Sequence, residues 1–307
     1  MSLIFGPIKS RRFGLSLGVD LSPDLKQCNF DCLYCELKSV KRTHSAQELS
    51  VPLSDVLDEV RQGLKKYPDI DVLTITANGE PTLYPKLNEL IRNINFLKEE
   101  FNFKTLILSN GGNIYNPYIQ ETLQLFDKVK LSMDCASEDC FKKVDRPDQK
   151  IELDDIKKDI LNFSKSFQGE LYIETLLLKD INSKDSEIEK LNKFYLSIDN
   201  IERIDLGSID RPPAYSVEGL TYDELLDISK KFDSSLPILI SKKSELKSVE
   251  NNYTKDEILQ TVERRPLTEK DAEYLFDKET LELFQDLKKS EHLDSRVIGG
   301  IEFFGNW

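Results

Sequence analysis

The sequence lacks any run of about 18 apolar residues, so it holds no segment that would cross a membrane as a helix. Its first residues also lack the basic stretch and the long apolar stretch of a secretory signal. These two absences predict a cytoplasmic protein with no membrane partner. At 307 residues, 39% of them hydrophobic, the chain is large enough for one large domain, or for a large domain and a small one.

The sequence also has few histidines and an excess of acidic over basic residues. The two histidines, His44 and His292, have no partners at metal-binding spacing, and neither is assigned a role. The net charge of −13 argues against broad, nonspecific binding to nucleic acid, because such binding comes from Lys and Arg side chains that neutralise phosphates. Residues 1–45 are locally basic, with seven Lys or Arg against four acids. This segment is either an ordinary solvated surface or a rim for an anionic substrate.

Strand patterns alternate with helical patterns over most of the chain. This rhythm predicts parallel βα units, because a parallel strand needs a crossover helix to return. Six or so units are present, fewer than the eight of a closed barrel. The predicted strands are 15–21, 71–77, 105–109, 129–133, 171–178 and 201–209, and the predicted helices are 53–64, 87–97, 117–126, 156–167, 188–195 and 224–232.

Three cysteines, Cys28, Cys32 and Cys35, form a CxxxCxxC pattern in which Tyr34 precedes the last cysteine. Three thiolates so close on one loop suit three irons of a four-iron cluster and leave the fourth iron without a protein ligand. A structural zinc site needs a fourth ligand, and only His44 lies near in sequence. Disulfide bonding does not explain the pattern, because three cysteines cannot all pair with one another and disulfides are rare in the cytosol, where this chain is expected. We therefore favour a cluster with one open iron.

Polar and turn-forming residues follow three of the predicted strands at their carboxyl ends. Active sites of parallel βα folds form at this edge, where the loops converge. The same residue types are ordinary turn formers, so a purely structural role is the alternative. The residues are Asn78, Gly79, Glu80, Pro81, Ser109, Asn110, Ser132 and Asp134.

With these motifs the sequence resembles the radical S-adenosylmethionine (SAM) superfamily, whose hallmark is this cysteine pattern with an aromatic residue at the position of Tyr34. The resemblance covers roughly residues 15–215 and implies an α/β fold, an open partial (β/α)6 TIM-like barrel. It also implies a 4Fe-4S cluster on Cys28, Cys32 and Cys35, with SAM chelated at the open iron. An electron from a reductant such as flavodoxin or ferredoxin would cleave SAM to methionine and a 5′-deoxyadenosyl radical that abstracts hydrogen from the substrate.

The resemblance also implies roles for the strand-end residues. The turn at Asn78, Gly79, Glu80 and Pro81 resembles the family's GGE-like motif, with Asn where Gly is commoner. Glu80 and nearby backbone carbonyls would then bind the amino group of the methionine moiety. The other strand-end residues correspond to positions that hold the ribose hydroxyls and the methionine carboxylate. They are Ser109, Asn110, Ser132 and Asp134.

Further candidates lie on later strands. Glu174 places a carboxylate in an apolar strand, which is costly unless it meets a ligand such as the cofactor or pairs with a cation. Asp210 and Arg211 precede two prolines that would fix their direction, and a fixed Arg suits a carboxylate or phosphate. Cys135 faces the predicted mouth and takes part in chemistry or guards the radical, unless it is an inert apolar residue. Cys140 lies five residues further on.

The last part of the chain reads as a separate small domain. A polar segment at 241–252 predicts a linker, which gives domains at 1–243 and 253–307. Helical patterns at 256–264, 269–276 and 278–289 and a β-like tail at 296–304 look like a winged helix-turn-helix. Residues 251–307 carry eight Lys or Arg and thirteen acids, and the third helix begins at an acidic end. We therefore expect this domain to pack on the barrel or dock a protein, and duplex DNA to be an unlikely partner.

Three functions remain open at this point. The opening segment 5–12 and the segment 210–213 resemble bacterial relatives of the wyosine-type tRNA-modifying enzymes, which implies modification of an RNA nucleoside. Those enzymes carry extra upstream cysteines, none of which precedes Cys28 here, so their reaction is not transferred. The alternatives are radical modification of a partner protein and a nonenzymatic iron–sulfur regulator. A basic rim is predicted to meet RNA, formed by Lys9, Arg11, Arg12, Lys41 and Arg42.

Overall fold

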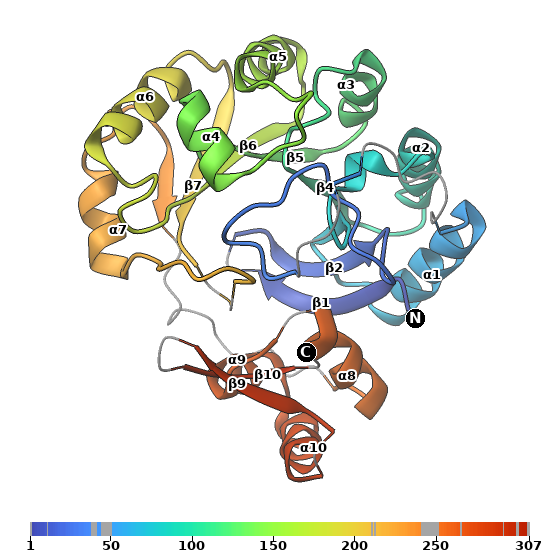
Figure 1. Ribbon diagram of the computed structural model, residues 1–307. Coiled ribbons are helices and arrows are strands. Elements are labelled where there is room, and N and C mark those ends of the chain that lie inside the picture. The colour runs from blue at the N-terminus through green and yellow to red at the C-terminus, as the bar shows by residue number, and fades with distance from the viewer. Residues whose placement is uncertain are drawn as a thin grey trace.

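One mostly parallel sheet forms the centre of the protein (Figure 1). The computed structural model describes residues 2–10, 12–37, 42–43, 51–209, 211, 213–240, 252–264, 266–290, 292–298 and 301–305. The strands lie side by side in chain order; β1 and β2 pair antiparallel, and all later neighbours pair parallel. The strands are β1 (Ile4–Ser10), β2 (Gly14–Asp20), β3 (Val72–Thr76), β4 (Lys104–Ser109), β5 (Lys128–Ser132), β6 (Glu170–Leu176), β7 (Ile201–Gly207) and β8 (Ile238–Ile240).

Most helices between the parallel strands cover the outer face of the curved sheet (Figure 1). Each buries one apolar side; in α1, Val56, Val60 and Leu64 are fully buried at helical spacing. The predicted α/β partial barrel is confirmed. No described helix combines the length and apolar character needed to cross a membrane. The helices are α1 (Leu53–Lys66), the single turn η1 (Pro81–Leu83), α2 (Leu87–Leu97), α3 (Pro117–Leu123), α4 (Glu138–Val144), α5 (Leu153–Ser166), α6 (Asp185–Tyr195) and α7 (Tyr222–Ser229).

Strand β1 is an element that the sequence did not predict. Its residues show no sustained apolar alternation, and the strand forms because β2 offers its backbone as a partner. Phe5 packs its ring against Gly18 of β2, where a Cβ would lie within 2.2 Å of the ring. Helix α4 and the three-residue β8 were likewise missed, because both are too short to show a period.

The tip of the β1–β2 hairpin fills the amino end of the sheet's concave face. The backbone N–H of Leu15 donates to the Asp71 carboxylate (2.7 Å), and Asp71 directly precedes β3, so the tip lies where the parallel strands begin. The ring of Phe13 meets Tyr172 edge-on, with centroids 4.9 Å apart. The guanidinium of Arg203 lies 5.1 Å from the first ring and 4.8 Å from the second. This hairpin tip, Arg12 and Phe13, therefore blocks the end of the sheet opposite the cysteine loop.

The C-terminal segment folds as a small module with its own apolar core and packs on β1 (Figure 1). The hydroxyl of Tyr253 donates to the carbonyl of Pro7 (2.7 Å), Ile8 joins the module's core, and Lys66 pairs with Glu257. The expected packing on the barrel is confirmed. The linker at 241–251 lies outside the described residues, and the winged-helix assignment stays a prediction. The module comprises α8 (Lys255–Arg264), α9 (Glu269–Leu275), α10 (Lys278–Lys289), β9 (Asp294–Ile298) and β10 (Ile301–Gly305).

Candidate metal centre and adjoining pocket

The cysteine loop leaves the carboxyl end of β2 and is fastened to the turn after β3. The backbone N–H of Gln27 donates to the Asn78 carbonyl (2.9 Å), and that of Glu80 donates to the Gln27 carbonyl (2.8 Å). Gly79 lies between these bonds at φ 140°, and a Cβ there would come within 1.8 Å of the Gln27 carbonyl oxygen. Only glycine allows this approach. The predicted motif turn, which continues through Pro81 into η1, therefore positions the loop that carries Cys28.

Donor groups point at two of the motif sulfurs. The backbone nitrogen of Phe30 lies 3.4 Å from Cys28 Sγ, and Asn110 Nδ2 lies 3.6 Å from the same sulfur. Lys26 Nζ lies 3.4 Å from Cys35 Sγ. Hydrogen bonds of this kind favour a thiolate and are among the contacts that tune iron–sulfur clusters. The side chains present therefore fit a cluster held through sulfur.

Cys28, Cys32 and Cys35 carry free thiols on the same loop. Across the described part of the chain, they do not form a group whose ligand atoms all lie within 4.8 Å of one another. Sulfurs around one tetrahedral zinc, each about 2.3 Å from the metal, lie roughly 4 Å apart. Burial, with a contribution from Glu80, raises the pKa of Cys28 to about 12. Burial and Asp145 likewise raise the pKa of Cys32, so metal binding has to displace these protons.

Glu80 ties the carboxyl ends of β3 and β4 together. Its carboxylate is almost fully buried, and Oε1 accepts hydrogen bonds from Thr82 N (2.9 Å), Thr82 Oγ1 (2.6 Å) and Ser109 Oγ (2.8 Å). Oε2 accepts one from Asn110 N (2.7 Å). Burial raises the pKa of Glu80 in spite of these bonds. A carboxylate oxygen accepts about two hydrogen bonds, and the described residues supply one to Oε2, which leaves a position for a further donor.

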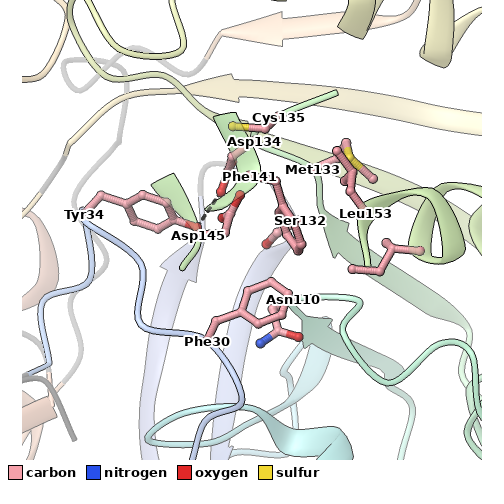
Figure 2. Close-up of a pocket in the computed structure, with 11 residues that line it drawn as sticks. Phe30, Tyr34, Asn110, Ser132, Met133, Asp134, Cys135, Phe141, Asp145 and Leu153 are labelled. Carbon is pink, nitrogen blue, oxygen red and sulfur yellow. Dashed lines mark hydrogen bonds between the residues drawn. The ribbon is translucent and has the colours of Figure 1, made fainter. Parts of the chain in front are cut away.

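A pocket adjoins the cysteine loop at the carboxyl ends of β4 and β5 (Figure 2). Apolar side chains form one part of its wall, and Phe30 and Phe141 meet there edge-on with ring centroids 5.5 Å apart. Three polar groups that the sequence predicted at strand ends, Asn110, Ser132 and Asp134, form another part, whereas Ser109 lies outside the lining and donates to Glu80. The lining residues are Phe30, Tyr34, Asn110, Ser132, Met133, Asp134, Cys135, Phe141, Asp145, Leu153 and Ile156.

Tyr34 is held by a pair of carboxyl groups. Its hydroxyl donates to Asp134 Oδ2 (2.5 Å) (Figure 2). Asp134 Oδ1 accepts from the backbone N–H of Leu176 (2.6 Å). Asp145 bonds to the Asp134 carboxyl group and lies 3.8 Å from Cys32 Sγ. Burial raises the pKa of Asp134 to about 6, and burial together with Asp134 raises that of Asp145 well above its ordinary value. The pair therefore keeps a proton at a pH where a carboxyl group ordinarily loses it.

Glu174 lies on the concave face of β6 but does not line this pocket. It is paired in register with Ser132 of β5 and Asp205 of β7, so the three side chains share one face. The neighbouring Thr175 points to the other face, where its hydroxyl meets Tyr195 of α6. The expected alternatives for Glu174 were a ligand or a cation, and in this structure its partners are cations. Its assignment to the cofactor stays a prediction.

Those cations come from two elements. Glu174 Oε1 lies 2.7 Å from Lys130 Nζ and 2.5 Å from Arg12 Nη1, and Arg12 also reaches Asp205 Oδ2 (3.3 Å). Burial opposes ionisation of Glu174, but Lys130 and then Arg12 outweigh burial and lower its pKa to about 2. These contacts anchor the hairpin tip to β5, β6 and β7.

We expect acid to weaken this anchor. The pKa of Glu174 lies near 4.5 when unperturbed and about 2 in the fold, so its contribution is complete above about pH 4.5 and is lost as the pH falls toward 2. The side chain is 31% exposed, so we expect ~2 kcal/mol, below the full equivalent of the pKa difference. Urea unfolding between pH 7 and 3 should show a shallower loss of stability for Glu174→Gln than for the wild type.

The control for this titration is Glu189→Gln, which alters an exposed pair with Lys193 on α6. It should leave the pH dependence of the unfolding free energy unchanged. Parallel curves for the wild type and Glu174→Gln would contradict the assigned role.

The segment after β7 folds back over the cysteine loop. Arg211 Nη1 donates to Glu36 Oε1 (2.5 Å), and the backbone N–H of Ala214 donates to the Cys35 carbonyl (2.7 Å). Asp210, predicted to act beside Arg211, lies outside the described residues. In this structure Arg211 fastens the segment to the loop, and a role for Arg211 in catalysis remains untested.

Cys135 is fully buried at the end of β5 and is joined to Cys140 by a disulfide. The sequence did not predict this bond. Both sulfurs lie near the Glu187 carboxylate, which accepts hydrogen bonds from the backbone N–H groups of Ala136 (2.6 Å) and Ser137 (2.8 Å). This structure therefore offers no free thiol at Cys135, and its part in the chemistry stays a prediction.

Among the described basic residues of the first 45 positions, Arg12 and Arg42 lie in different places. Arg12 extends from the hairpin tip along the concave face into ion pairs with Glu174 and Asp205. Arg42 adjoins the cysteine loop, since Thr43 N donates to the Cys28 carbonyl (2.9 Å). Arg11 and Lys41 lie outside the described residues. The prediction of one continuous basic rim is wrong for Arg12, because the hairpin turns that residue inward.

Sequence reasoning missed two residues that contact the motif sulfurs. Asp145 follows a short helix without a recognisable pattern, and Lys26 stands in a loop without a period. A cue was available for Lys26, because a lysine two residues before the first motif cysteine stays close to the metal loop wherever the chain turns.

Comparisons with known proteins agree with this geometry. The sequence pattern of the family described as "Radical SAM superfamily" matches residues 24–194. A UPF0026 protein of Helicobacter pylori is 40% identical over 305 residues, 98% of this chain and 97% of that protein. A radical SAM methyltransferase from Sphaerobacter thermophilus gives a TM-score of 0.56 at 16% identity, over 74% of this chain and 66% of that one. SuiB of Streptococcus suis, bound to its precursor peptide SuiA, gives a TM-score of 0.56 at 18% identity, over 75% of this chain and 49% of that one. These two structures share the fold.

Proposed function

The chain belongs to the radical SAM superfamily, and from this premise we propose that it modifies a nucleoside of an RNA, specifically a tRNA. It is an enzyme that uses a 4Fe-4S cluster and SAM. When bound, the cluster supplies the electron that cleaves SAM and so starts radical chemistry. The alternative of a nonenzymatic regulator is set aside, since family and fold both support an enzyme.

The chain's own residues have separable tasks in this proposal. Cys28, Cys32 and Cys35 hold the cluster, and the turn at Gly79 fixes their loop. The free acceptor position of Glu80 takes the amino group of SAM. The carboxyl pair that locks Tyr34 shapes the pocket wall and keeps water from that side.

Four strand-end groups complete the cofactor pocket. They project from β4 and β5 and present hydroxyl, amide and carboxyl groups to the ribose and the methionine carboxylate. They are Asn110, Ser132 and Asp134, which line the pocket, and Ser109, which lies outside the lining and donates to Glu80.

One observation carries the choice of substrate class: the concave face beyond the pocket is polar and charged. Ser132, Glu174 and Asp205 share that face, and Arg12 and Lys130 cross it. Nucleobases have donors and acceptors around a planar edge, and carboxylates and guanidinium groups match such an edge. These charges compensate one another in ion pairs, and an apolar substrate would remove water from them without offering a hydrogen bond in return. The resemblance of segments 5–12 and 210–213 to wyosine-type relatives points the same way.

We further propose a cytoplasmic location, with reduced flavodoxin or ferredoxin as the electron donor. The C-terminal module, proposed as a winged helix, supports the alternative of a protein partner. It is acidic, and its third helix α10 follows Asp277 and carries Glu279 in its first turn. Acidic groups at that end repel phosphate, so duplex DNA is not a proposed partner.

The proposal is tested with the reconstituted full-length protein, SAM, dithionite and total tRNA from cells that lack the gene. We expect a new nucleoside in the digested tRNA by mass spectrometry, and formation of 5′-deoxyadenosine severalfold faster with tRNA than without it. Matched incubations with the protein fraction of the same cells control for a protein substrate. If the protein fraction and not tRNA accelerates formation of 5′-deoxyadenosine, the substrate is a partner protein.

A further inference from the structure

Lys26 is a buried cation directly beside the metal loop. Its side chain is 6% exposed, and its Nζ lies 3.4 Å from Cys35 Sγ and 3.9 Å from Asp31 Oδ1. Burying an ammonium group is costly unless a partner compensates. Among the described residues, its partners are the sulfur of Cys35 and one carboxylate.

That carboxylate is shared with other groups. Asp31 Oδ2 accepts from Tyr215 OH (2.7 Å) and lies 3.1 Å from Arg146 Nη2, and Arg146 stacks over the Tyr215 ring at 4.5 Å. A second cation therefore compensates Asp31 on its other oxygen, at a shorter distance than Lys26. Much of the positive charge of Lys26 is left to act on the sulfur of Cys35.

We propose that Lys26 is a positioning residue that raises the reduction potential of the 4Fe-4S cluster through its contact with Cys35. Reduction adds one electron to the cluster, taken from the flavodoxin or ferredoxin class of donor, and no bond to Lys26 forms or breaks. A fixed positive charge close to a ligand sulfur favours the more negative, reduced cluster. A hydrogen bond to the sulfur acts in the same direction. This role does not depend on the substrate, so it stands or falls separately from the proposed RNA chemistry.

The test is an anaerobic redox titration of the reconstituted full-length protein, followed by the electron paramagnetic resonance signal of the reduced cluster. Lys26→Met removes the charge and keeps the length of the side chain, and we expect at least a tenfold lower ratio of reduced to oxidised cluster at a fixed potential. That ratio equals a shift of about 59 mV to more negative potential for a one-electron couple. Lys26→Arg keeps the charge and should stay within about threefold of the wild type.

Lys142→Met is the matched control, because it removes one positive charge from α4 at an exposed pair with Glu138. Water and salt screen that charge, so the midpoint reduction potential of the cluster in Lys142→Met should equal the wild-type value. If Lys26→Met does not retain its irons, Lys26→Gln, which also lacks the charge, is compared with Lys26→Arg in its place. Equal midpoints for the neutral variant and the wild type, at equal iron content, would overturn the proposal.

Discussion

Replacing Cys32 with alanine is expected to reduce the iron content of the anaerobically reconstituted protein from about four atoms per chain to near zero. The cluster would lose one of three protein ligands, and Cys32 sits between the other two on a loop that the Gly79 turn holds in place. Reductive cleavage of SAM should disappear with the irons. Iron and sulfide analysis, the visible absorption spectrum, and 5′-deoxyadenosine released after dithionite measure the three effects.

The matched control is Cys140→Ala, which changes a cysteine outside the motif. It should keep about four irons and the basal cleavage of SAM in the absence of substrate. A Cys32→Ala protein with as much iron as the wild type would refute the assignment of the loop as the cluster site.

A second large effect is expected from Glu80→Ala. The substitution leaves four buried or partly buried donors on Thr82, Ser109 and Asn110 without their acceptor. Each unsatisfied donor costs about 1–3 kcal/mol before relaxation, so we expect unfolding to be easier by ~3 kcal/mol overall. Loss of a charge-assisted hydrogen bond to the amino group should also weaken SAM binding about tenfold or more. Denaturant unfolding and equilibrium dialysis with labelled SAM measure the two quantities.

Two variants separate the structural role of Glu80 from binding. Glu80→Gln keeps an acceptor for Thr82 and Ser109 but places an amide opposite the N–H of Asn110, so it should recover part of the stability and little of the SAM affinity. Glu99→Ala, at an exposed position near the end of α2, should change neither. The cluster should survive in all three. If Glu80→Ala binds SAM with normal affinity, another residue must bind the amino group of SAM.

The sequence was most informative where local pattern and tertiary role coincide. The apolar spacing of Val56, Val60 and Leu64 predicted α1, and the run at 71–77 predicted β3, because each buries one whole face or strand. The cysteine pattern predicted a metal loop, since the chemistry of such a loop depends on spacing within one segment. The strand-end residues Asn110 and Ser132 met in one pocket because parallel strands bring their carboxyl ends to the same edge.

The remaining features depend on contacts between distant segments. Strand β1 exists through its pairing with β2, and no periodicity in its own residues shows it. Arg12 seemed part of a basic rim, and the hairpin instead carries it to Glu174, 162 positions later in the chain. Single-sequence reasoning has no access to such long-range pairings.

The return of the C-terminal module to β1 has a consequence for how the chain is made. Spatial order in the sheet equals chain order, so each parallel strand finds its partner already present as it leaves the ribosome. The outer edge of β1 is the exception. Tyr253, which bonds to Pro7, is synthesised 246 positions after it. An uncovered edge strand is a template for pairing with other chains, so the first strand to emerge is the last to be protected, and nascent chains that stall before residue 253 are the ones we expect to aggregate.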